Sequence, residues 1–224
     1  MEDSSIGGST EAKIAIINQR LNAHHATLIA VTKTRSEAQM EAVAHAGVLD
    51  WGENRVQEIE RKRLLYPDVR WHMIGHLQSN KVKFIAPYIH LIHSVDSLAL
   101  LQAINKEAAK CGRVIGCLLQ IYIAKEESKY GLDEAELAEI LLPNNLAALP
   151  NIQICGLMGM ATNTEDTTIV RKEFAGLKTL FDATKAGAFA ESPTFNTLSM
   201  GMSGDWELAL EEGSTMIRIG SLLF

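Results

Sequence analysis

The chain of 224 residues contains only three cysteines, Cys111, Cys117 and Cys155, and no two of them form a C-x-x-C pair. So small and odd a number argues against a disulfide framework or a zinc finger, and it favours a reducing, cytoplasmic location. Proline is also sparse, at five residues, and no linker or low-complexity tract interrupts the sequence. We therefore expect a single domain over residues 1–224.

Long apolar runs and an excess of positive charge are missing as well. The most apolar stretch, residues 114–124, is interrupted by Gln120 and is far shorter than the roughly 20 residues of a membrane-spanning helix. The net charge is -6, from 21 basic and 27 acidic residues, whereas a nucleic-acid or acidic-membrane binder needs a basic face. The polar residues 1–10 do not resemble a signal peptide. We expect neither a nucleic acid nor a membrane as partner.

What the sequence does contain is a regular alternation of short apolar runs and amphipathic segments. The first apolar run predicts a strand at 27–33, and Ser36 with Gln39 predicts a capping box at the start of the next helix. Further strands are expected at 48–51, 70–74, 90–95, 114–124, 152–158, 194–198 and 215–219. Further helices are expected at 55–65, 79–85, 97–111, 133–142, 167–185 and 203–212. Eight strands joined by helices predict a (β/α)8 TIM barrel, with one extra N-terminal helix at 10–23.

The alternative fold is an open, doubly wound sheet, which has the same alternation of strands and helices. The number of strands favours the barrel. So does the lack of a glycine-rich turn after the first strand, where a doubly wound nucleotide-binding sheet usually carries one.

Lys33 stands at the end of the first predicted strand. Functional groups of a parallel barrel gather at the C-terminal ends of its strands. A low dielectric there lowers the pKa of an amine and frees it as a nucleophile, which Schiff-base chemistry requires. The alternative is a lysine that extends into solvent or pairs with Glu53. The pattern alone gives the two interpretations about equal weight.

Two turns rich in glycine and serine follow the seventh and eighth predicted strands. The first contains Ser199 and Ser203, and the second contains Arg218 and Gly220. Each turn by itself is typical of a tight turn with a serine cap. Backbone N–H groups at these two positions of a barrel often bind phosphate, so the two turns together favour a phosphate site. A phosphate beside a reactive lysine suggests pyridoxal 5'-phosphate (PLP).

Seven motifs, in order along the chain, closely resemble those of the pyridoxal phosphate homeostasis proteins. They are VTKT at 31–34, WGENRVQE at 51–58, WHMIGHLQSNK at 71–81, SVDS at 94–97, GLMGMA at 156–161, LSMGMS at 198–203 and GSTMIRIG at 213–220. This family is a single-domain relative of the alanine racemase N-terminal barrel. The resemblance extends from about residue 26 to the C-terminus and therefore implies the same barrel.

The resemblance also implies roles for individual residues. Lys33 would carry PLP as an internal aldimine, Arg218 would face the pyridine nitrogen, and Asn54 would lie near the cofactor. The residues implied to hold the phosphate are Ser199, Ser203 and Gly220. Lys129 matches a family lysine near the mouth of the site.

The function implied is that of a non-catalytic protein that holds PLP, helps to control its level and hands it to apo PLP-dependent enzymes. The alternative is a PLP-dependent amino-acid racemase, which needs a base on each face of the substrate carbon. Related racemases take the second base from a tyrosine of a further domain in the partner subunit. We expect this chain to lack that domain and to be a monomer; Tyr130 is its only tyrosine in a loop expected at the barrel mouth. A weaker third hypothesis is an aldolase-like enzyme that uses a Lys33 Schiff base on a phosphorylated sugar.

Two further patterns are interpreted without a function. His72 and His76 have a metal-ligand spacing only on a helix, and they flank a strand end, so no metal site is expected. Residues 61–63, Arg-Lys-Arg, are interpreted as a solvated helix face and not as a nucleic-acid patch.

Overall fold

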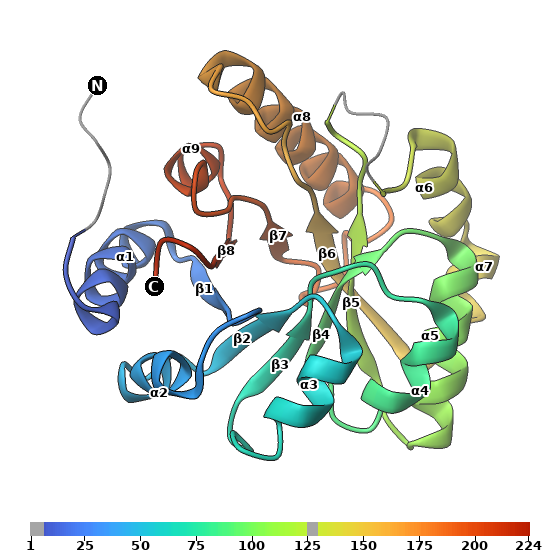
Figure 1. Ribbon diagram of the computed structural model, residues 1–224. Helices are drawn as coiled ribbons and strands as arrows, with labels where there is room; N and C mark the ends of the chain where they lie inside the picture. Colours follow the sequence, from blue (N-terminus) through green and yellow to red (C-terminus); the bar gives the residue numbers. More distant parts are fainter. Residues whose placement is uncertain (1–6, 125–129) are drawn as a thin grey trace.

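The computed structural model describes residues 7–124 and 130–224, and its strands form one closed barrel. All eight strands are parallel and follow one another around the barrel in sequence order (Figure 1). They are β1 Thr27–Val31, β2 Asp50–Glu53, β3 Arg70–Met73, β4 Leu91–Val95, β5 Ile115–Gln120, β6 Ile152–Met158, β7 Thr197–Ser199 and β8 Met216–Ile219. The first strand pairs with the last, and Ile29 lies opposite Arg218. The closed barrel confirms the predicted fold, and the open doubly wound sheet is excluded.

Helices surround the barrel, and α1 precedes the first strand as expected (Figure 1). Their bounds are α1 Thr10–His24, α2 Glu37–His45, α3 Val56–Lys62, α4 Val82–Ile85, α5 Leu98–Lys110, α6 Glu134–Ile140, α7 Pro143–Ala147, α8 Thr167–Ala186 and α9 Trp206–Glu211, with a 3-10 turn at Ser79–Lys81. In the part of the chain that the structure describes, none of the helices combines the length and apolar character needed to cross a membrane.

Local hydrogen bonds explain where several of these helices begin. Ser36 and Gln39 form the expected capping box, in which each side chain bonds the other residue's backbone N–H. Asp133 and Glu136 form a second capping box at the start of α6. The Pro-Asn-Asn sequence at 143–145 indicates a turn, yet these residues begin α7. Pro143 occupies the first turn of this helix, where a missing N–H costs nothing.

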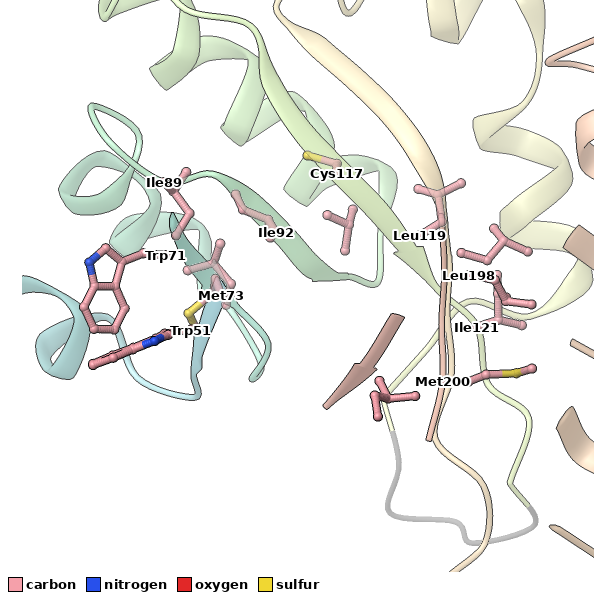
Figure 2. Close-up of a cluster of buried hydrophobic side chains, with 14 of the residues drawn as sticks. Trp51, Trp71, Met73, Ile89, Ile92, Cys117, Leu119, Ile121, Leu198 and Met200 are labelled. Carbon is pink, nitrogen blue, oxygen red and sulfur yellow. The ribbon is translucent and has the colours of Figure 1, made fainter. Parts of the chain in front are cut away.

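The main hydrophobic core lies between the barrel and its helices. Figure 2 shows part of it, with Trp51 and Trp71 from β2 and β3 at one side. Their rings meet edge to face with centroids 5.7 Å apart, a favoured aromatic geometry. A smaller apolar cluster joins Leu91, Leu118 and Met158 from β4, β5 and β6.

Strand alternation places polar groups on the same face as this smaller cluster. His93 lies two residues after Leu91 on β4, so both side chains point to the same side of the sheet. A set of polar and charged residues is buried with His93, each no more than 7% exposed: Asp50, His72, Ser199 and Arg218. Buried polar groups need hydrogen-bond partners, and these residues find them in one another and in Arg70.

Candidate functional site

Lys33 follows directly on the end of β1, and its side chain is exposed. The backbone around it is held to the neighbouring strand, because the N–H of Thr32 donates to the carbonyl of Gly52 over 3.2 Å. The next residue, Thr34, has a φ of 61°, which is rare for a β-branched side chain. Strained backbone of this kind concentrates at functional sites, and here it lies next to the candidate nucleophile.

A buried ion pair supports the backbone before Lys33. The Lys62 ammonium donates to the Glu53 carboxylate and, over 2.8 Å, to the carbonyl of Thr32. The Thr32 hydroxyl donates to the same carboxylate over 2.7 Å. Both charged side chains are fully buried. The suggested Lys33–Glu53 pair is therefore wrong, and so is the solvated position expected for Lys62.

Replacing Lys62 with methionine is expected to lower the free energy of unfolding by about 3–5 kcal/mol, because it leaves the Glu53 carboxylate buried without its counter-charge. Urea unfolding followed by circular dichroism measures the change. Arg61→Met is the matched control, since Arg61 is an exposed neighbour on the same helix, and it should cost less than about 1 kcal/mol. The double variant Glu53→Gln/Lys62→Met should recover much of the loss. Similar stabilities for Lys62→Met and Arg61→Met would contradict this account.

Arg218 projects from β8 among the ends of two neighbouring strands. Its Nη1 group donates to the Ser199 carbonyl over 2.9 Å and to the Ser199 hydroxyl over 2.7 Å. Its Nη2 group donates to the carbonyl of Gly159, just after β6, over 3.1 Å. These three acceptors are neutral, so the guanidinium is a buried positive charge held by dipoles.

This arrangement leaves Arg218 suited to a further acceptor. Burial lowers the pKa of Arg218 to about 10, and the charge of Asp205 acts in the opposite direction. The side chain is therefore protonated at neutral pH. A guanidinium has five N–H groups, and three of them are used in the described part of the chain. The N–H groups that remain can donate to an anion or to a lone pair such as that of a pyridine nitrogen.

Ser203 and Gly220 meet in the turns after β7 and β8. The Ser203 hydroxyl accepts hydrogen bonds from the backbone N–H groups of Gly220, over 3.2 Å, and of Leu222, over 3.4 Å. It keeps its own hydrogen to donate. Gly201 permits the preceding turn, since its φ is 96° and a Cβ there would lie 2.6 Å from the Cβ of Ala209. Both backbone N–H groups are occupied by Ser203, so the Ser203 hydroxyl hydrogen is the donor available to a phosphate group at this turn.

Asn54 lies just after β2 and lines a cavity of about 500 Å³ together with Met73, His76 and Lys81. A Cβ at Gly75 would lie only 2.5 Å from the carbonyl oxygen of Asn54, so glycine allows these two loops to approach. The residues that line this cavity do not include Lys33 or Arg218. Lys129 lies outside the described residues.

The two histidines considered for a metal occupy different surroundings. His76 is exposed, lies 3.1 Å from an oxygen of Asp96 and stacks on the ring of Tyr130. His72 is buried and approaches Asp50 instead. Asp50, His72 and His90 do place potential ligand atoms within 4.8 Å of one another. However, both Asp50 oxygens already accept hydrogen bonds from Arg70.

The structure thus brings five of the six sequence-predicted residues to the ends of three adjacent strands, β7, β8 and β1. They are Lys33, Ser199, Ser203, Arg218 and Gly220. Sequence reasoning missed three buried residues that contact them directly or through others: Lys62, His93 and Asp50. Two of these could have been found in the sequence, because His93 and Asp50 are polar residues inside the predicted apolar strands 90–95 and 48–51.

Comparison with known proteins shows which family the chain belongs to. Residues 8–224 match the family model described as "Alanine racemase, N-terminal domain". A pyridoxal phosphate homeostasis protein of Vibrio alginolyticus is 39% identical over 204 residues, covering 88% of this chain and 84% of the relative. The protein of the same name from Escherichia coli K12 is 35% identical over 212 residues, with the same two coverages.

Solved structures show the same fold. PipY of Synechococcus elongatus, determined with PLP bound, has a TM-score of 0.87 at 35% identity and covers 96% of this chain and 100% of its own. An alanine racemase of Bartonella henselae has a TM-score of 0.69 at 18% identity and covers 96% of this chain and 58% of its own, so it supports the fold alone. The chain therefore belongs to the alanine racemase N-terminal domain family and, within it, to the pyridoxal phosphate homeostasis proteins.

Proposed function

We propose that this chain binds PLP without major catalytic activity of its own, with the amine of Lys33 as the point of covalent attachment. The observation that carries the proposal is the joint position of Lys33 and Arg218. They extend from strands β1 and β8, which pair directly, and both lie toward the C-terminal ends of these strands. One offers an amine to an aldehyde, and the other offers N–H donors to a ring nitrogen. When bound, the cofactor supplies the aldehyde and an electron-accepting ring.

The other residues have separate roles in this proposal. Ser203 and the backbone N–H of Gly220 would receive the phosphate, the N–H by exchanging its present hydrogen bond to the Ser203 hydroxyl for one to a phosphate oxygen. Ser199 is fully buried and its hydroxyl already bonds Arg218, so we assign it to holding that arginine. Asn54 would border the site from the β2 side. These assignments differ from the sequence-based expectation in one respect: Ser199, expected to hold the phosphate, is assigned to Arg218.

We further propose that the protein helps to control the level of PLP and passes it to apo PLP-dependent enzymes. The names of its relatives support the first part. We propose a monomer in a reducing, cytoplasmic location. The three cysteines are free, and Cys117 is buried, where burial raises the pKa of its thiol and makes it unreactive.

The proposal is tested by comparing PLP with pyridoxal, which lacks the phosphate. PLP should bind at least about 100-fold more tightly, since two or more charge-assisted hydrogen bonds of about 1.5–3 kcal/mol each are lost without it. Equilibrium titration under low phosphate measures both dissociation constants. Ser203→Ala should reduce the preference for PLP, whereas Ser192→Ala, a distant serine, should leave it unchanged. Equal affinities for the two compounds would refute the phosphate assignment.

A further inference from the structure

A continuous row of hydrogen bonds leads away from Arg218 through the buried polar residues. The Ser199 hydroxyl, which accepts from Arg218, lies 3.0 Å from Nδ1 of His93. Nε2 of His93 lies 3.0 Å from Nδ1 of His72. Nε2 of His72 lies 3.0 Å from an oxygen of Asp50. The row therefore joins residues of β8, β7, β4, β3 and β2.

At the Asp50 end of this row, the direction of the hydrogen bonds is fixed. Arg70 donates to both oxygens of Asp50, from Nε over 2.7 Å and from Nη2. An aspartate that accepts from arginine at both oxygens is ionised and can only accept. Burial raises the pKa of Asp50, but the hydrogen bonds from His72 and Arg70 outweigh it and lower the pKa to about 2. Nε2 of His72 must therefore carry a hydrogen and donate it to Asp50.

The opposite end is fixed as well, because arginine has only donors. The hydroxyl oxygen of Ser199 accepts from Arg218, so its own hydrogen is available for Nδ1 of His93. If both imidazoles are neutral, Nε2 of His93 then donates to Nδ1 of His72. Every donor in the row meets one acceptor, and all the hydrogen bonds run in the same direction, from Arg218 to Asp50.

If the row takes up an additional proton, fewer of its polar groups have a hydrogen-bond partner. An additional proton on His72 would reverse its bond to His93, and Nδ1 of His93 would then donate to Ser199. The Ser199 oxygen would accept twice, and its hydrogen would lose its acceptor within the row. Burial lowers the pKa of His72 and outweighs the opposite effect of Asp50. Burial also lowers the pKa of His93, and the positive charge of Arg218 acts in the same direction there. The neutral arrangement is therefore the one present at neutral pH.

We propose that His93 and His72 are positioning residues for the cofactor site. They orient the Ser199 hydroxyl so that its lone pair faces Arg218, and this fixes the guanidinium with its remaining N–H groups available to a ligand ring nitrogen. This inference rests on the proposed function, because the ring nitrogen belongs to PLP. Neither histidine would touch the ligand; both act through Ser199.

The first test concerns the chain without ligand. Long-range ¹H–¹⁵N NMR of the histidine rings distinguishes a nitrogen that carries hydrogen from one that does not. His72 and His93 should both carry hydrogen on Nε2 and none on Nδ1 at neutral pH. A hydrogen on Nδ1 of either ring would reverse the row and overturn the inference.

The second test measures how strongly the site recognises the ring nitrogen. Dissociation constants are compared for PLP and for its analogue with C–H in place of the ring nitrogen. Wild-type protein should prefer PLP by about 10- to 100-fold, the worth of a charge-assisted hydrogen bond. His93→Phe removes the acceptor of the Ser199 hydrogen, so this preference should fall by about 3- to 10-fold, the worth of one neutral hydrogen bond.

Two further variants separate positioning from general stability. His93→Asn keeps an acceptor near the Nδ1 position and should retain most of the preference. His90→Phe is the matched control, because the His90 ring lies 5.2 Å from that of His72 but outside the row, and it should leave the preference unchanged. A purely structural role of His93 would weaken both ligands equally in His93→Phe, and the unchanged ratio would overturn the inference. If wild-type protein binds neither ligand, it is instead the proposed function that fails.

Discussion

Lys33→Ala is expected to abolish covalent attachment of PLP. Wild-type protein mixed with PLP should gain a visible absorption band, and borohydride reduction should leave a pyridoxyl group on the peptide that contains Lys33. The variant should show neither signal, because it lacks the amine that follows the end of β1, the strand paired with the Arg218 strand β8. The protein itself should remain folded, since the Lys33 side chain is exposed and supports no core contact.

Lys81→Ala provides the matched control. Lys81 lines the cavity beside Asn54, so it is a second lysine at the same end of the barrel. Its replacement should leave the absorption band and the labelled peptide unchanged. A Lys33→Ala protein that keeps the full band would show that the attachment site is wrong, and mass mapping of the reduced protein would then identify the lysine used, with Lys129 examined first.

Most of the fold follows from short-range patterns in the sequence. Apolar runs of strand length alternate with amphipathic segments, the capping box at Ser36 occurs where the sequence predicts it, and a helix begins after Asp133 as expected. Three strands differ most from the prediction in their bounds: β2 is Asp50–Glu53 instead of 48–51, β5 ends at Gln120 instead of 124, and β7 begins at Thr197 instead of 194. Glu53 lies beyond the predicted strand, and its contacts with Lys62 and the Thr32 hydroxyl allow it to be buried within β2.

Only part of the candidate site could be predicted from the sequence, because its buried contacts also depend on partners distant in sequence. Lys33, Arg218 and the two turns stand at strand ends, so the barrel topology is enough to bring them together. The contacts behind them depend on residues far apart in sequence, such as His93 and Ser199, which are 106 positions apart and 3.0 Å from each other in the structure. No local pattern specifies such a pair. The contact between His93 and Ser199 forms only in the closed barrel, where buried polar groups need hydrogen-bond partners.

We expect the PLP-loaded protein to show no enzyme-like exchange of the α-proton of alanine. PLP accepts electrons from a substrate best when its ring nitrogen is protonated, and a carboxylate next to that nitrogen favours this state. Arg218 has the opposite effect. It keeps its own proton at neutral pH and can only donate, so a ring nitrogen facing it must be the unprotonated acceptor.

An arginine at this place weakens the electron sink and so slows removal of the α-proton from either enantiomer, and racemisation needs a second base in addition. Exchange with racemisation needs a base on each face of the carbon, and Lys33 can serve only one of them. Tyr130, the tyrosine that the sequence places at the barrel mouth, stacks on His76 instead, with ring centroids 4.2 Å apart. NMR of L- and D-alanine in deuterated water with the loaded protein measures the exchange. A turnover of about one per second or faster that disappears in Lys33→Ala would restore the racemase hypothesis, because rates of that size are typical of enzymes.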